Sequence, residues 1–248
     1  MERSYWEKIA PDYNDEIFDV LANDKKAIIK KTIRQFASKT KSVIDIGCAI
    51  GKWLAILSPA FKKVYAIDIS QQNLDIAKEK YSRLDNIIYQ RVDMSNAKAE
   101  IPKCDLAICI NAILTGTQQK RNVFFKNLQK CVKKNGHLIL VIPSFESFML
   151  TSIIRQRWDP DKNSKGAIDK KRSVGQLQNM LEGNASIDGV PHKHYLKEEL
   201  ALLLSNEGFA VKDFFKIEYE WNTEFLKPPH WLTNPKPWDW MVLAKRSA

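Results

Sequence analysis

A glycine turn and a later aspartate are the residues best placed for ligand chemistry. The turn, Asp45-Ile-Gly47-Cys48-Ala-Ile-Gly51, follows a short apolar run, and Asp68 ends the next one. Gly47 permits a tight turn and a close approach of a ligand to the backbone, and free N–H groups at the following helix start favour a polar group. An acidic residue about 20 positions after such a turn can accept hydrogen bonds from ribose hydroxyls. The pair therefore predicts a nucleoside-containing ligand, and the absence of a G-x-G-x-x-G pattern argues against a dinucleotide.

The elements that must position these residues alternate between apolar strands and amphipathic helices, which is typical of an α/β, doubly wound, mostly parallel sheet. We predict strands at 43–47, 64–69, 87–92, 106–110, 137–142, 210–221 and 238–244. The predicted helices are 15–38, 52–57, 71–83, 118–133 and 197–206.

The length of 248 residues fits a single domain over 1–248. Residues 1–40 are expected to form an N-terminal helical lid. Residues 144–196 are too long for a plain connection in a compact domain. We interpret them as a substrate-cap insertion after the fifth strand, with short helices at 148–157 and 174–181.

The ordered motifs resemble the class I S-adenosylmethionine-dependent methyltransferases of the small-molecule type. The resemblance runs from about Tyr13 to Gly208. Its matching pieces are Asp45–Gly51, Ala66–Ser70, Val92–Met94, Asp105–Asn111, Leu138–Pro143, and the pair Glu199-Leu200 with Gly208-Phe209. It implies a Rossmann-like fold of seven strands in which the last strand, 238–244, is inserted antiparallel. One departure is Ala49, where the family often has glycine.

The resemblance also implies S-adenosyl-L-methionine as the cofactor and assigns residues to its parts. The residues expected around the methionine part are Asp45, Gly47, Cys48, Gly51, Asn111 and Ala112. The residues expected around the adenosine part are Asp68 at the ribose, Ile69 and Met94 at the adenine ring, and Asp93 at its amino group. Tyr13 would close over the cofactor.

Methyl transfer to a weakly acidic O–H or N–H group also needs a nearby base. His194 and His192 precede the 197–206 helix and are the candidate catalytic residues, with capping or packing of the helix as the structural alternative. A metal site is not expected, because no third ligand accompanies this His-x-His pair. The candidate acceptor-binding residues are Glu146, Phe148, Tyr195, Trp221 and Trp231.

The formal net charge of +10 favours an acidic partner, but the basic residues are dispersed. We therefore expect an S-adenosylmethionine-dependent methyltransferase that acts on an O or N atom of a small-molecule acceptor. Methylation of RNA or another macromolecule, and non-catalytic cofactor binding, remain alternatives. The charged N-terminus lacks a signal-peptide core and no run of about 18 apolar residues occurs, so we expect a cytoplasmic protein without membrane association. The sequence leaves the oligomeric state open.

Overall fold

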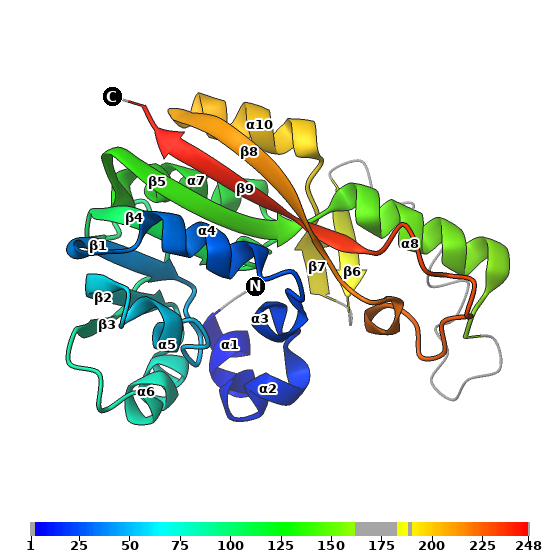
Figure 1. Ribbon diagram of the computed structural model, residues 1–248, viewed down its shortest axis with the longest axis horizontal. Coiled ribbons are helices and arrows are strands. Elements are labelled where there is room, and N and C mark those ends of the chain that lie inside the picture. Colours follow the sequence, from blue (N-terminus) through cyan, green and yellow to red (C-terminus); the bar gives the residue numbers. More distant parts are fainter. Residues whose placement is uncertain (1–2, 162–182, 188–189, 248) are drawn as a thin grey trace.

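The computed structural model, which describes residues 3–161, 183–187 and 190–247, is built on a seven-stranded sheet (Figure 1). Its strands are β1 (Ser38–Ile46), β2 (Phe61–Asp68), β3 (Ile87–Arg91), β4 (Cys104–Ile110), β5 (Val132–Pro143), β8 (Phe209–Glu218) and β9 (Trp238–Arg246). They lie in the order β3-β2-β1-β4-β5-β9-β8. β1 to β5 are paired in parallel, and β9 lies antiparallel between β5 and β8. The predicted fold class and the antiparallel place of the last strand are confirmed.

The central strands are buried on both faces, which explains their unbroken apolar sequence. In β5, Leu138 and Leu140 belong to one core cluster, whereas Ile139 and Val141 belong to the other. This alternation follows the two-residue period of a strand. The sheet therefore separates two hydrophobic layers, each of which requires helices to cover it.

Helices cover both faces. The helices of the sheet domain are α4 (Ile28–Phe36), α5 (Leu54–Leu57), α6 (Gln71–Lys80), α7 (Gln118–Cys131) and α10 (Lys197–Asn206). Phe125 and Leu128 of α7 pack in the same cluster as Leu200 of α10. Ile33 of α4 and Leu57 of α5 pack in the opposite cluster.

The prediction of one continuous helix over 15–38 is wrong. The chain instead forms α1 (Arg3–Ile9), the short helix η1 (Ala10–Asp12), α2 (Tyr13–Glu16), α3 (Val20–Asn23) and then α4. The breaks coincide with aspartates that cap new helices: Asp19 accepts a hydrogen bond from Ala22 N, and Asp24 accepts from Ile28 N and Ile29 N. Aspartate side chains compete with helical hydrogen bonding in this way, which the apolar spacing alone did not reveal. β1 begins at Ser38, so the expected lid over 1–40 also overlaps the sheet.

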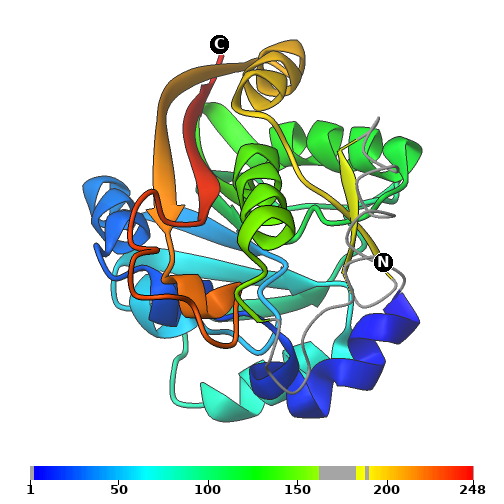
Figure 2. The same ribbon diagram turned by 90° about the vertical axis from the view of Figure 1, so that its right-hand side faces the viewer.

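The segment expected as a cap contains α8 (Phe145–Trp158) and a two-stranded sheet of β6 (Asn184–Ile187) and β7 (Val190–Lys193). The helix expected at 174–181 lies outside the described residues. α8 and the segment after β8, which includes η3 (Trp221–Thr223), project beyond the carboxyl ends of the parallel strands (Figures 1 and 2). Ile154 packs there with Trp221, Phe225 and Leu232.

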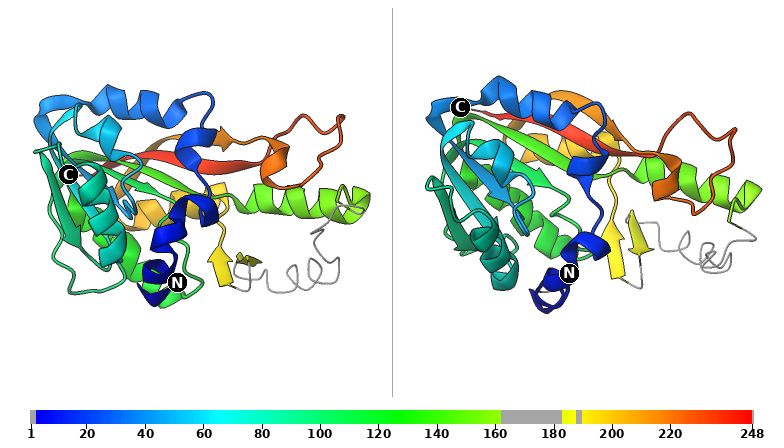
Figure 3. Two further views of the ribbon diagram at one scale, coloured as in Figure 1. Left: turned by 90° about the horizontal axis from the view of Figure 1, so that it is seen from below. Right: turned by 60° about the horizontal axis from the view of Figure 1, so that its bottom comes forward.

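The N-terminal helices α1 to α3 lie at the same end of the sheet as β6 and β7 (Figure 3). This end therefore gathers three separate segments around the carboxyl ends of β1, β4 and β5, the place where open α/β sheets bind ligands. Within the described part of the chain, no helix is long and apolar enough to cross a bilayer.

Candidate functional site

The turn after β1 brings the backbone against the loop after β4. Gly47 has a φ of +71°, and a Cβ there would lie 2.5 Å from Ala112 Cβ. The amides of Gly47 and Cys48 both donate to Ile67 O, at 2.9 and 3.0 Å. Only glycine avoids both the strain and the collision, which gives the glycine of the motif a structural reason.

Ala49, the departure from the family pattern, also has a left-handed backbone, with a φ of +47°. Its amide donates to Asp68 Oδ2 at 2.9 Å, and Asp68 Oδ1 accepts from Ser70 N at the same distance. Asp68 thus fixes the turn after β1 and the start of α6. Burial raises the pKa of Asp68, although these hydrogen bonds oppose the rise.

Asp45, at the end of β1, has a buried oxygen that lacks a partner. No described side chain or backbone group donates to its Oδ2 atom. Burial, together with the charge of Asp68, raises the pKa of Asp45 to about 8. A buried carboxyl group without a donor is costly unless a ligand completes its hydrogen bonds. The site therefore fits a ligand with a cationic or hydrogen-donating group next to Asp45.

Two adjoining cavities meet at this turn. The larger has a volume of about 580 Å³ and lies between the ends of the parallel strands, the N-terminal helices, α8 and the segment after β8. The smaller, of about 100 Å³, extends along the ends of β2 and β3. The described residues that line both are Trp6, Tyr13, Gly47, Ala49, Ile110, Asn111 and Leu114. A single elongated ligand can therefore occupy both cavities.

Most of the residues predicted to bind the cofactor are brought together here. Asp45 and Cys48 line the larger cavity. The smaller cavity is lined by Asp68, Ile69, Asp93, Met94 and Ala112, and the predicted residues Tyr13, Gly47 and Asn111 line both. Gly51 lines neither, because it packs against Leu54, Tyr81 and Ala77, where it shapes the turn.

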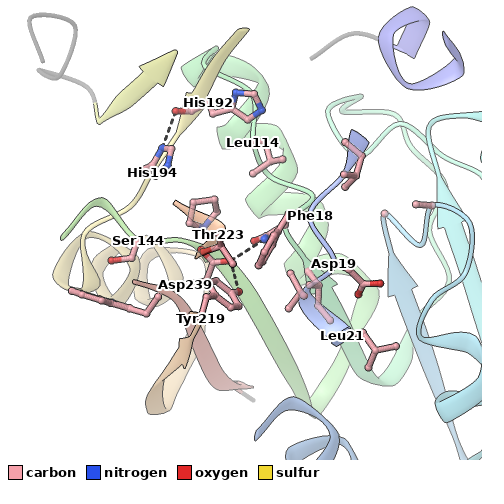
Figure 4. A pocket seen from close by; sticks show the side chains of 18 of the residues that line it. Phe18, Asp19, Leu21, Leu114, Ser144, His192, His194, Tyr219, Thr223 and Asp239 are labelled. Atoms are coloured by element: carbon pink, nitrogen blue, oxygen red, sulfur yellow. Dashed lines mark hydrogen bonds between the residues drawn. The ribbon is translucent and has the colours of Figure 1, made fainter. Parts of the chain in front are cut away.

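The two predicted histidines also line the larger cavity, on the side formed by β7 (Figure 4). His194 Nδ1 lies 3.2 Å from His192 O, and the ring packs at 4.9 Å from that of Phe148. Burial lowers the pKa of His194 to about 4. His194 is therefore neutral near pH 7 and is a weak proton acceptor. No group of three potential metal ligands occurs among the described residues.

Of the residues predicted to bind the acceptor, Phe148 lines the cavity and the other four do not. Glu146 accepts hydrogen bonds from Lys197 N, Trp240 Nε1 and Ser144 Oγ, which joins α8 to α10 and β9. Tyr195 is fully buried in the core. Apolar and aromatic composition did not distinguish packing residues from cavity residues.

The same error affects both tryptophans. Trp221 is buried and stacks on Phe225, with ring centroids 5.6 Å apart. Trp231 is 57% exposed and packs edge-on against Trp158. Both anchor the segment that follows β8 and do not face the cavity.

The polar residues at the cavity that the sequence analysis missed include Tyr219, Glu224 and Asp239. Asp239 Oδ2 accepts hydrogen bonds from Asn111 Nδ2 at 2.9 Å and from the Tyr219 hydroxyl at 2.8 Å (Figure 4). Asp239 stands between two tryptophans in the last strand. A carboxylate in such an apolar strand carries a desolvation cost, and that cost was the available sequence signal.

Comparison with known proteins agrees with this geometry. The family model described as a methyltransferase domain matches residues 43–136. The malonyl-[acyl-carrier protein] O-methyltransferase of Marinomonas sp. is 26% identical over 141 residues, which are 55% of this chain and 52% of that protein. The mitochondrial ubiquinone biosynthesis O-methyltransferase of Schizosaccharomyces pombe is 30% identical over 104 residues, covering 40% and 37%. The chain spans about half the length, or less, of the curated relatives it matches.

Solved structures share the fold over nearly the whole chain. An S-adenosylmethionine-dependent methyltransferase from Clostridium acetobutylicum superposes with a TM-score of 0.62 at 18% identity, covering 98% of this chain and 100% of that one. The N-methyltransferase NodS from Bradyrhizobium japonicum, in complex with S-adenosyl-L-homocysteine, gives a TM-score of 0.63 at 12% identity, covering 99% and 98%. At these identities the likeness establishes the fold alone.

Proposed function

We propose that the chain is a class I S-adenosylmethionine-dependent methyltransferase and that it methylates an O or N atom of a small molecule bound in the larger cavity. One observation carries the proposal: the larger cavity adjoins the smaller one through shared lining residues at the turn after β1. A cofactor that spans both cavities would present its methyl group to a partly enclosed space.

The smaller cavity fits the adenosine part. Asp68 would accept hydrogen bonds from the ribose hydroxyls, since its oxygens keep acceptor capacity beyond the two backbone amides. Ile69 and Met94 would contact the adenine ring, and Asp93 would accept from the amino group. When bound, S-adenosylmethionine supplies an electrophilic methyl group on a positively charged sulfur.

The methionine part would lie over the turn after β1. Asp45 lines the larger cavity and would receive the ammonium group there at Oδ1, because Oδ2 is the sealed oxygen. Asn111 and Ala112 would form the floor, and Tyr13 would close over the ligand. The protein would contribute alignment and exclusion of water.

The acceptor would occupy the rest of the larger cavity, between α8, β7 and the segment after β8. Phe148 would contact it, together with Ser144, Thr223 and the two histidines. The low pKa of His194 makes the histidine a weak base. A proton acceptor is therefore needed elsewhere in the cavity.

Calorimetric titration with S-adenosyl-L-homocysteine tests the cofactor assignment. We expect saturable binding, and Asp68→Ala should weaken it about tenfold or more, because two hydroxyl hydrogen bonds to a buried carboxylate are lost. Asp85→Ala, at an exposed aspartate, is the matched control. Absence of binding to the wild type would overturn the proposal. Binding without conversion of S-adenosyl-L-methionine to S-adenosyl-L-homocysteine in the presence of any acceptor would instead favour the non-catalytic alternative.

A further inference from the structure

Asp239 stands where the cofactor floor meets the acceptor region. Its Oδ2 atom is held by Asn111, from the loop after β4, and by Tyr219, just beyond β8. The carboxylate therefore has a fixed position at the start of β9 and points into the larger cavity (Figure 4). Burial raises the pKa of Asp239, although the two hydrogen bonds oppose the rise.

The second oxygen of Asp239 remains available to a ligand. No donor within the described part of the chain reaches Oδ1. This oxygen is also not one of the fully buried polar atoms that lack a hydrogen-bond partner. Asp239 as a whole is half-buried. Since both donors bind Oδ2, Oδ1 is the oxygen that a bound molecule can use.

Glu224, which follows η3, adds a second carboxylate to the same part of the cavity. Burial raises the pKa of Glu224, the Arg155 guanidinium lowers it, and the charge of Asp239 raises it further. Arg155 donates to the backbone carbonyl of Glu224 at 2.8 Å. The charge of Asp239 therefore disfavours ionisation of Glu224, and a cation between the two carboxylates would relieve that repulsion.

The cavity as a whole carries an acidic excess that opposes the charge of the chain. Its described lining contains five acidic residues and two basic ones: Glu16, Asp19, Asp45, Glu224 and Asp239, with Lys52 and Arg155. Lys52 already pairs with Asp19 at 2.8 Å. The proposed cofactor accounts for Asp45, whereas Asp239 and Glu224 lie on the acceptor side.

We propose that the acceptor is an amine, bound as an ammonium ion by Asp239 and Glu224, and that Asp239 Oδ1 takes its proton. This inference rests on the proposed methyltransferase function and specifies its substrate class. Tyr219 and Asn111 are positioning residues, because they hold the carboxylate through its other oxygen.

The step balances in atoms and charge. An N–H bond of the ammonium breaks, and its proton moves to Oδ1, which leaves a neutral amine with a lone pair. That pair forms the N–C bond while the C–S bond breaks with its electrons on sulfur. The products are an N-methylammonium ion, a neutral thioether and a protonated Asp239. A general base is required because a protonated amine has no lone pair for the attack.

A binding experiment tests the substrate class without requiring turnover. The complex with S-adenosyl-L-homocysteine is titrated with phenethylamine, benzylamine and spermidine, and with the size-matched 2-phenylethanol and 3-phenylpropanoate. We expect the amines to bind and the alcohol and carboxylate to bind at least about tenfold more weakly, as expected for loss of a charge-assisted hydrogen bond. Formation of N-methylated product from a bound amine is the second readout.

Charge-removing variants locate the ammonium. Glu224→Gln and Asp239→Asn should each weaken amine binding about tenfold or more. Glu224→Gln should leave affinity for S-adenosyl-L-homocysteine within about twofold. Two control variants remove the same charge outside the cavity. Glu220 is close to Glu224 in sequence, but it is exposed and pairs with Lys236, so Glu220→Gln is the first control. The second is Asp213→Asn, at an exposed position of β8. Both controls should bind amines like the wild type.

The outcomes separate this inference from the proposed function. If the cofactor product binds but amines bind no better than the alcohol, or the panel shows no amine binding, the amine assignment is overturned and the methyltransferase proposal stands. Methylation of only phenols or carboxylic acids would likewise overturn the amine assignment and leave the methyltransferase proposal standing. Failure of the cofactor product to bind overturns both. Equal losses in Glu220→Gln and Glu224→Gln would show a general charge effect and also contradict the ammonium site.

Discussion

At the residue scale, the site is defined by buried carboxylates with different partners. Asp68 has a backbone amide on each oxygen, Asp239 has two donors on one oxygen, and Asp45 has an oxygen without any. Burial favours the neutral form of all three. Each is stabilised as an anion only to the extent that donors or cations surround it, so ligand binding and protonation should be coupled.

Asp45 makes that coupling measurable. Its pKa of about 8 means that it is largely protonated near pH 7 before a ligand binds. A ligand ammonium favours the ionised form, so binding of S-adenosyl-L-homocysteine should release up to one proton. Affinity should rise between about pH 6 and 8, by at most about tenfold per pH unit, and level off above about pH 8.

Calorimetry at about pH 7, in buffers that differ in ionisation enthalpy, measures the released proton. Asp45→Asn should abolish that release and flatten the pH dependence, whereas Asp85→Asn should behave like the wild type. Unchanged proton release in Asp45→Asn would disprove the assignment of Asp45 to the ligand ammonium.

At the scale of elements, the loops after β1 and β4 are set by left-handed residues. Gly47, Ala49 and Asn111 all have positive φ angles. Asn111 has this left-handed backbone, and its side chain donates a hydrogen bond to Asp239 Oδ2. The loop after β4 therefore connects the turn after β1 to Asp239 through the Asn111 side chain.

Gly47→Ala tests the close contact between these loops. We expect a loss of about 2–4 kcal/mol in the free energy of unfolding, from backbone strain and from collision with Ala112. Gly208→Ala is the strain-only control, because its φ is +77° and the nearest atom to its Cβ would lie 3.7 Å away. It should cost about 1–2 kcal/mol.

Urea denaturation measures both losses, and the double variant Gly47→Ala/Ala112→Gly should recover the part due to collision. Equal destabilisation by the two single glycine variants would mean that the contact with Ala112 carries no cost of its own.

At the scale of the whole molecule, α1 is docked on the sheet domain by Glu7. This carboxylate accepts hydrogen bonds from Ser70 Oγ, Gln71 N and Gln72 N at the start of α6. Burial alone would raise the pKa of Glu7, but hydrogen bonds from Gln72 and Gln71, and from Arg3 and Ser70, lower it to about 2. An anion at a helix N-terminus is favourable. Glu7 therefore holds Tyr5 and Trp6 where they line the larger cavity.

Glu7→Gln should loosen this docking and speed dissociation of S-adenosyl-L-homocysteine about two- to fivefold at pH near 7. Stopped-flow tryptophan fluorescence can follow the release, since Trp6 and Trp53 line the cavity. Because the pKa of Glu7 is lowered in the folded protein, the stabilisation that Glu7 gives to the docked α1 is present above about pH 4.5. It is lost as the pH falls through about 2. Glu79→Gln, exposed at the other end of α6, is the control and should release the ligand at the wild-type rate.

The distribution of charge also bears on the class of acceptor. The chain carries a formal net charge of +10, yet the described lining of the larger cavity has five acidic residues and two basic ones. Next to Glu224 and Asp239, this cavity disfavours phosphate groups. The acidic lining therefore argues against RNA as the methyl acceptor, although the net charge of the chain favours an acidic partner. The composition alone could not show this local difference in charge.

The sheet could be predicted from local sequence patterns, because strand burial and helix amphipathicity are periodic along the chain. The glycine turn after β1 could also be predicted, because Gly47 and Asp68 lie at fixed distances along one strand–helix–strand unit. The sequence did not determine the helix breaks at Asp19 and Asp24, since capping competes with apolar spacing. Local motifs therefore predicted most of the residues that meet at the turn after β1 and line the two cavities.

The arrangement around Asp239 depends on contacts between residues that are distant in the sequence. Asn111, Tyr219 and Asp239 are far apart in the chain and meet because β9 lies between β5 and β8. Glu146, Tyr195 and Trp221 are of residue types that often line pockets. In the structure, Tyr195 and Trp221 are buried by packing, and Glu146 accepts a hydrogen bond from Trp240 of β9. Which polar or aromatic side chain faces a cavity depends on long-range strand order, and no local pattern encodes it.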